Sequence, residues 1–136
     1  MGSSEYFEHV ADMGVVGRGT TLGEAYEGAA AAMFGLMADL SEVHPRETVR
    51  FSFTEPDVEL ALVVWLNRLL VEARTRGMVF RTFRLRREND TWHGEASGER
   101  WREGLTRGTE VKGATLTALR VGQRDGTWEA RCVVDM

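Results

Sequence analysis

Two aspartates stand at the ends of strand-like runs near the two termini of the chain. Asp12 lies between a first and a second β-like run, and Asp135 ends an apolar run one residue before Met136. Strand-forming runs usually end in glycine, proline or asparagine turns, so an acid in this place needs an explanation. If the first and last strands lie side by side, Asp12, Asp135 and the terminal carboxylate of Met136 converge. Such oxygen ligands, without histidine or thiolate, favour Ca²⁺ or Mg²⁺ over Zn²⁺.

These acids also have an ordinary structural interpretation. Asp12 lies among small residues, where an aspartate readily hydrogen-bonds its own backbone in a turn. The presence of Asp135 at the end of another strand favours a shared function for the two acids. His9, three residues before Asp12, is a weaker candidate because a lone strand histidine is usually structural.

Lys112 follows Glu110 in a polar loop that leads into a strand-like run. Its ammonium group can be a plain solvated charge. It can also lie over an acidic cluster and balance it, or meet the phosphate of a partner. The residues around Lys112 allow either interpretation.

Motifs of familiar enzyme classes are missing from the sequence. No serine lies in a Gly-x-Ser-x-Gly elbow, and no two histidines have the spacing of zinc ligands. The glycines at positions 17 and 19 precede a helix but have neither a phosphate-loop lysine nor dinucleotide-binding spacing. A metal-dependent hydrolase is therefore disfavoured, because no general base or activated nucleophile accompanies the acids.

Composition indicates one globular domain, 1–136, with residues 1–4 expected to be flexible. The chain has 136 residues, of which 43% are hydrophobic and 28% charged, enough for one core. A formal charge of −4 opposes strong direct binding to nucleic acid. No apolar stretch is long enough to span a membrane, and the start of the chain has no secretory pattern. With Cys132 as a single core cysteine, these features predict a cytoplasmic protein.

Apolar residues at helical spacing predict a first helix that begins at Leu22 and ends near Asp39. Its start carries a capping box, in which the Thr21 side chain accepts a hydrogen bond from the amide of Glu24 and the Glu24 carboxylate reaches back toward the start of the helix. Alanines in its centre allow close packing on a sheet.

A second helix is predicted at 58–74, capped by Asp57 and stopped at Gly77. Basic residues in its last turn suit the helix dipole. The side chains predicted to point inward are Leu60, Ala61, Val64, Trp65, Leu69 and Leu70.

Alternating apolar and polar residues predict the strands, and Asp125-Gly126 gives a strong hairpin signal. The predicted strands cover 6–10, 14–18, 50–53, 79–85, 91–96, 116–121 and 128–134, with a polar loop at 98–108. The order predicts an α+β domain in which two helices pack on a mixed, largely antiparallel β-sheet.

Five segments of the chain resemble the archease family in matching order. Residues 8–14 (EHVADMG) are similar to that family's HTADIG opening, and 19–26 (GTTLGEAY) to its GxTLEEAF. Residues 32–40 (AMFGLMADL) resemble AMFxLMTD, and 108–112 (GTEVK) match GTEVK. The closing VVDM corresponds to a final Val-Leu-Asp-aliphatic run.

The resemblance implies an archease-like fold and a non-enzymatic accessory role. Archeases assist the guanylylating tRNA-splicing RNA ligase, promoting its guanylylation and multiple turnover. Carried over to this sequence, Asp12 and Asp135 would ligate a divalent metal, Met136 would add an oxygen and Lys112 would be the functional basic residue. Asp39 also matches a family acid and, like Glu110, is a weaker candidate.

The chain departs from the family pattern at two places, and the resemblance leaves a second partner open. Val10 stands where a threonine is usual, and 113–117 replace a tyrosine that often has a histidine beside it. The alternative role is a chaperone-like modulator of another RNA-processing enzyme, such as a tRNA methyltransferase.

Overall fold

The computed structural model describes residues 2–9 and 12–136, with the main chain alone at positions 8 and 9. The α+β class is confirmed, and the strands divide into two sheets in which every described pairing is antiparallel. The five-stranded sheet contains β1 (Ser3–His9), β2 (Asp12–Gly19), β6 (Gly113–Ala114), β7 (Arg120–Arg124) and β8 (Thr127–Asp135). The three-stranded sheet contains β3 (Glu47–Thr54), β4 (Met78–Glu88) and β5 (Thr91–Arg100). The helices are α1 (Leu22–Met37), α2 (Val58–Arg76) and the short 3-10 helix η1 (Leu40–Glu42).

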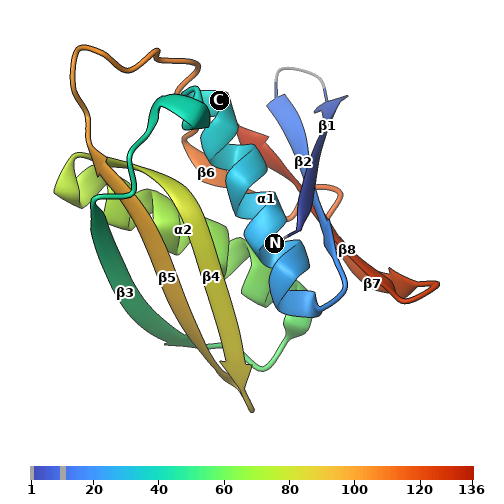
Figure 1. Cartoon of the computed structure of the whole chain (residues 1–136). Coiled ribbons are helices and arrows are strands. Elements are labelled where there is room, and N and C mark those ends of the chain that lie inside the picture. The colour runs from blue at the N-terminus through green and yellow to red at the C-terminus, as the bar shows by residue number, and fades with distance from the viewer. Residues whose placement is uncertain (1, 10–11) are drawn as a thin grey trace.

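Helix α1 lies between the two sheets (Figure 1). As predicted, the Thr21 hydroxyl accepts the N–H of Glu24 at 3.1 Å. The Glu24 carboxylate accepts the N–H of Thr20 at 2.8 Å, one residue before the capping residue. Close packing on β2 depends on Gly17, because a Cβ there would lie 2.0 Å from the carbonyl oxygen of Ala25.

Helix α2 begins where Asp57 accepts the N–H of Leu60 at 3.0 Å. It ends at Arg76, two residues later than predicted, where Gly77 adopts the left-handed conformation with φ 64°. The prediction that Leu60 points inward is wrong: it is 39% exposed, because it lies opposite the buried stripe. That stripe consists of Ala61, Leu62, Trp65, Leu66, Leu69, Leu70 and Ala73. Among the described residues, no helix combines the length and apolarity that crossing a membrane requires.

Aromatic side chains join the helices to the three-stranded sheet. The indole N–H of Trp65 donates to the carbonyl oxygen of Tyr26 at 2.9 Å, and both residues are fully buried. The Tyr26 ring stacks on Trp92 of β5 with 5.6 Å between ring centroids. Burial of large rings with satisfied polar atoms makes this the most stabilising part of the core.

Carboxylates on the helices cover backbone groups at the sheet edges. Glu27 of α1 accepts the N–H of Leu85 on β4 at 2.9 Å, and Glu59 of α2 accepts the N–H of Val121 on β7 at 3.3 Å. Unpaired edge groups favour aggregation, so these bonds protect the sheets.

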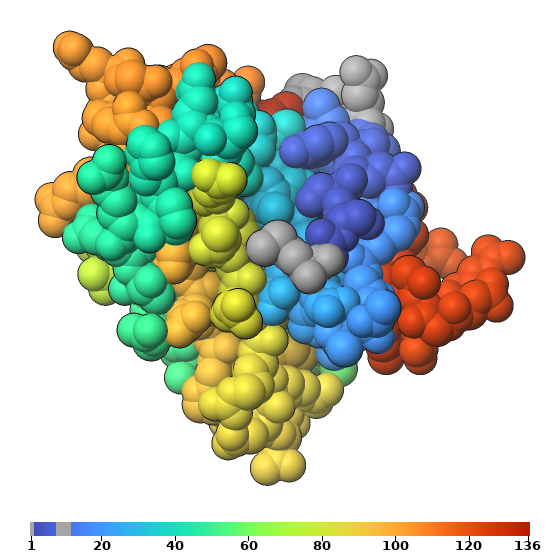
Figure 2. Space-filling model, in the orientation of Figure 1, coloured from blue at the N-terminus to red at the C-terminus, as the bar shows by residue number. Residues whose placement is uncertain are grey.

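The region after β5 differs from its prediction. Strand β5 continues to Arg100, so the loop predicted to begin at 98 begins at Trp101. The strand predicted at 116–121 is confirmed only at 120–121, because the chain pairs with β8 in two short pieces, β6 and β7, and Ala118 between them has φ 55°. The predicted Asp125-Gly126 hairpin is confirmed, with φ values of 51° and 79°. It stands out from the body of the molecule (Figures 1 and 2).

Candidate functional site

The strand register brings Asp12 and Asp135 to the same end of two neighbouring strands. Strands β2 and β8 are antiparallel, with Met13 opposite Val134. Continuing that register by one residue places Asp12 opposite Asp135, and directly opposed residues have Cβ atoms about 5 Å apart. Strand β8 pairs with the second strand, β2, and β1 lies on the far side of β2.

Side chains on these strands alternate between two faces of the sheet. Val15 and its partner Cys132 are fully buried toward α1. Asp12 and Asp135 stand three residues from that pair along their strands, so their register positions belong to the opposite face. Asp135 is exposed and Asp12 partly exposed, as a working site requires.

The main chain of Lys112 is attached to the same strand end. Its N–H donates to the carbonyl oxygen of Asp135 at 2.8 Å, and the next residue, Gly113, pairs with Asp135 in the β6–β8 ladder. The Lys112 side chain is exposed, and it is the one lysine among the 17 basic residues of the chain. We call Asp12, Lys112, Asp135 and Met136 the acidic corner.

Two side chains of α2 hold the segment around Lys112. The guanidinium group of Arg74 donates to the carbonyl oxygens of Val111 and Lys112, the latter at 2.8 Å. The Asn67 amide accepts the N–H of Ala114 at 2.8 Å and donates to the Ala114 carbonyl at 3.2 Å. Asn67 and Arg74 are seven residues apart, about two helical turns, and therefore lie on one face. The helix thus fixes the backbone on both sides of Lys112.

Sequence reasoning missed Asn67 and Arg74. Their partners lie 47 and 37 residues away along the chain, too far for any local motif to reveal. The available signal was Asn67 itself, a polar residue placed between the buried residues Leu66 and Leu69. An amide in that place needs a hydrogen-bond partner.

Within residues 108–112, some groups support the fold and others are exposed to solvent. The N–H groups of Gly108 and Thr109 donate to the carbonyls of Met37 and Leu36 at 2.7 and 2.8 Å, which completes the end of α1. Val111 is fully buried. The Glu110 side chain is exposed, and within the described part of the chain it has no hydrogen-bond partner.

The two other weaker candidates are Asp39 and His9. The Asp39 carboxylate accepts the Ser41 N–H at 3.0 Å and the Ser41 hydroxyl at 2.6 Å, and so caps η1. Those hydrogen bonds, from the hydroxyl first, lower the pKa of Asp39. The main chain of His9 pairs with Asp12, but its side chain lies outside the described residues.

Comparison with known proteins assigns the fold and the motifs to one family. The model of the archease protein family matches residues 5–136. The chain belongs to the archease family. The protein archease of Sulfolobus acidocaldarius is 36% identical over 135 residues, covering 97% of each chain. That of Thermococcus gammatolerans is 38% identical over 139 residues, again covering 97% of each.

Two solved structures have the same fold as this member of the archease family. The solution structure of Methanobacterium thermoautotrophicum protein 1598 has a TM-score of 0.82 at 33% identity, covering 98% of this chain and 99% of that one. A crystal structure of a Thermotoga maritima archease, described as a possible chaperone, has a TM-score of 0.67 and covers 97% and 96%. At 20% identity this second likeness shows the fold alone.

The acidic corner offers donors that suit a hard cation. Asp12 and Asp135 carry carboxylate oxygens, and Met136 is predicted to add an oxygen of its own. Among the side chains that the structure describes, which exclude those at positions 8 and 9, no group of three histidines, cysteines, aspartates or glutamates is placed to hold a metal ion. Remaining ligands would be main-chain oxygens or water, which Ca²⁺ and Mg²⁺ accept and a structural zinc site does not. The metal site therefore remains a prediction, with a donor set that fits it.

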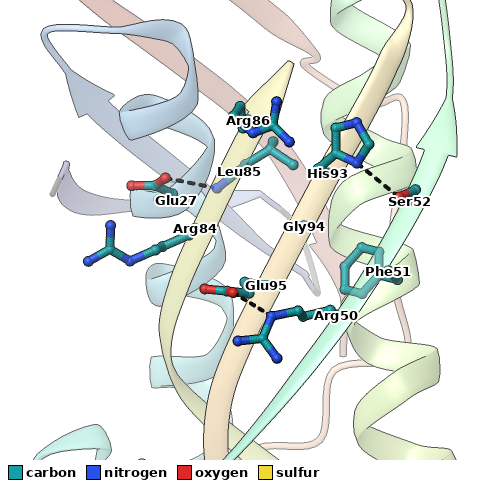
Figure 3. Close-up of a pocket in the computed structure, with 10 residues that line it drawn as sticks. All are labelled: Glu27, Arg50, Phe51, Ser52, Arg84, Leu85, Arg86, His93, Gly94 and Glu95. Carbon is teal, nitrogen blue, oxygen red and sulfur yellow. Dashed lines mark hydrogen bonds and ion pairs between the residues drawn. The ribbon is translucent and has the colours of Figure 1, made fainter. Parts of the chain in front are cut away.

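A hollow of about 600 Å³ on the outer face of the three-stranded sheet is chemically different (Figure 3). Arg50 of β3 pairs with Glu95 of β5 at 2.8 Å, and Ser52 is 3.1 Å from the Nδ1 atom of His93. Cross-strand pairs of this kind are typical of a solvated sheet face. Arg50 and Glu95 compensate each other's charge, and Ser52 and His93 are bonded to each other, so this hollow is a weaker candidate than the acidic corner.

Proposed function

We propose that this protein is a non-enzymatic activator of a guanylylating tRNA-splicing RNA ligase, and that the acidic corner carries the activity. Membership of the archease family supports the class of role. The observation that supports the proposal is the bond from the Lys112 N–H to the Asp135 carbonyl, combined with the pairing of Met13, next to Asp12, with Val134, next to Asp135. Main-chain positions distant in sequence thereby share one end of the sheet.

The chemistry of the acidic corner suits a charged partner. Like charges at one edge of a sheet disfavour one another, so their accumulation has a cost to the fold. We infer that Asp12, Asp135 and an oxygen of Met136 hold Ca²⁺ or Mg²⁺. The bound ion would offset this repulsion and attract phosphate oxygens. The Lys112 ammonium, on a backbone fixed by Arg74, would address the nucleotide phosphates or an acidic group of the ligase.

The proposal is tested by measuring ligase guanylylation with and without the protein. Asp12→Ala and Lys112→Ala should abolish or strongly reduce the stimulation while leaving the melting temperature near that of the wild type. A chelator should reduce stimulation by wild-type protein. Asp90→Ala, which removes an exposed acid at the turn between β4 and β5, is the matched control and should stimulate normally. Full stimulation by Asp12→Ala would refute the proposed role of the acidic corner.

A second candidate is a chaperone-like action on an RNA-processing enzyme, suggested by the description of the Thermotoga maritima protein as a possible chaperone. The exposed large apolar side chains of the described chain are Tyr6, Leu60, Val71 and Leu116. They come from three separate places, β1, α2 and the segment between β6 and β7, and a general holdase needs a contiguous apolar patch. The surface thus favours a dedicated partner. Light scattering of the heated ligase, with and without the protein, distinguishes protection from activation.

A further inference from the structure

A cavity of about 340 Å³ lies beside the segment that carries Lys112. It is bounded by the ends of α1 and α2 and by residues 101–111. Its lining includes Phe34, Leu70, Met78 and Val111, which are at most 4% exposed, and the partly buried Trp101. The cavity therefore has an apolar floor continuous with the core.

The rim of this cavity is charged. Arg107 lies over the Trp101 ring, with its guanidinium carbon 4.0 Å from the ring centroid. Arg74 and Glu110 also border the cavity, and all three charged side chains are exposed. Two cations and one acid give the rim a net positive charge on a chain whose net charge is −4. The rim thus attracts an acidic group.

The distribution of polar groups favours a protein partner over a small molecule. Small-molecule sites place a few polar groups inside the pocket to orient the ligand. Here the floor is apolar and the charges lie at the rim, the arrangement of a pocket that receives an interface anchor residue. Continuity with the acidic corner through Val111 and Lys112 indicates the same partner.

We propose that this cavity is a docking site for a large apolar side chain with an acidic side chain beside it, both on the surface of the ligase. The inference rests on the proposed function and adds the contact that holds the ligase. The acidic corner would then act on a partner that the cavity has already bound. Binding and stimulation should therefore be separable by mutation.

Filling the cavity tests the proposal. Ala73 of α2 lines the cavity and is 7% exposed, so Ala73→Phe should occupy it from within. We expect affinity for the ligase, measured by calorimetry, to fall about 10- to 100-fold, the scale of a lost anchor. Val71→Phe adds the same ring on the exposed side of α2, where Val71 is 52% exposed, and should bind normally.

A charge reversal at the rim tests the same site without touching the core. Arg107→Glu should weaken ligase binding by about tenfold or more, whereas Arg124→Glu on β7, with an equal change in charge, should not. If Ala73→Phe fails to fold, Arg107→Glu still tests the docking site. Normal binding by a folded Ala73→Phe, or by Arg107→Glu, overturns the docking site. So does a wild-type dimer that Ala73→Phe converts to a monomer, since a second copy would then occupy the cavity.

The two proposals fail in different ways. If the docking site alone is wrong, Ala73→Phe binds and stimulates normally while Asp12→Ala still loses stimulation. If the acidic corner alone is wrong, Asp12→Ala stimulates normally while Ala73→Phe loses binding. Wild-type protein that neither binds nor stimulates the ligase overturns both.

Discussion

The aromatic core around Trp65 and the acidic corner around Asp135 are built in opposite ways. In the core, the Trp65 side chain is fully buried, and its N–H donates to Tyr26. In the acidic corner, the main chain is held by hydrogen bonds at Lys112 and Asp135, while the charged side chains are exposed. Side chains of the core pack against one another, whereas the charged side chains of the acidic corner are exposed and free to contact a partner.

This difference indicates where stability and function reside. Buried aromatic side chains stabilise the fold through the area they remove from water. Exposed charges contribute little to stability, so their fixed backbone positions need another explanation. We therefore expect substitutions in the core to unfold the protein and substitutions in the acidic corner to inactivate it.

The largest expected effect on stability is that of Trp65→Ala. Loss of this buried ring should lower the free energy of unfolding by about 3–5 kcal/mol in denaturant titrations. Trp101→Ala, at a partly buried ring covered by Arg107, should cost about 1–2 kcal/mol. Equal losses at the two tryptophans would contradict the distinction between the core and the periphery.

Removal of the Asn67 amide should have an intermediate effect at the boundary of the two regions. Asn67→Ala leaves the partly buried backbone groups of Ala114 without their partner, which should cost about 1–2 kcal/mol. The Ala114 amide should also exchange faster in hydrogen-exchange NMR. Asn67→Asp keeps the oxygen that accepts the Ala114 N–H and loses the donor to the Ala114 carbonyl, so exchange at that amide should change less than in Asn67→Ala. Unchanged exchange at Ala114 would show that α2 does not hold this segment.

The smallest effect concerns Glu99, which is 5% exposed and lies away from both regions. Its carboxylate accepts from Arg102 at 2.9 Å and from the N–H of His44 at 2.6 Å. These bonds lower the pKa of Glu99 to about 2 from an ordinary 4.5. A depressed pKa stabilises the fold above the unfolded-state pKa, and that stabilisation is lost as pH falls toward 2.

Thermal melts across this acidic range check the linkage. The Glu99→Gln protein should melt at a lower temperature than wild type at neutral pH, and the difference should shrink below pH 4.5. Glu103→Gln, at an exposed neighbouring acid, should follow the wild-type profile. A constant difference at all pH values would assign the effect to packing.

Local signals made much of the fold predictable. Asp57 and Gly77 set the ends of α2, and Asp125-Gly126 sets the last hairpin, because each acts on its own backbone. The strand predicted near 116–121 was confirmed only at 120–121 because pairing with β8, a non-local partner, decided its position. Local patterns carry no information on such pairing.

The candidate site was predictable only in part, for the same reason. Acids at two strand ends predicted that Asp12 and Asp135 lie together, and the pairing of the adjacent residues, Met13 with Val134, brings their strand ends side by side. The supporting residues Asn67 and Arg74 contact backbone groups of a segment distant in sequence. Nothing in the residues adjacent to them specifies those contacts.

The most direct test of the account is Asp135→Asn, with ligase stimulation and melting temperature measured on the same preparations. The substitution keeps the size of the side chain and removes only its charge. The main-chain carbonyl oxygen of residue 135, which accepts the Lys112 N–H at 2.8 Å, stays in place. We predict that stimulation falls to background while the melting temperature stays within about 3 °C of wild type. Full stimulation by Asp135→Asn, or a loss of stimulation that merely follows a loss of stability, would contradict the separation of the acidic corner from the core.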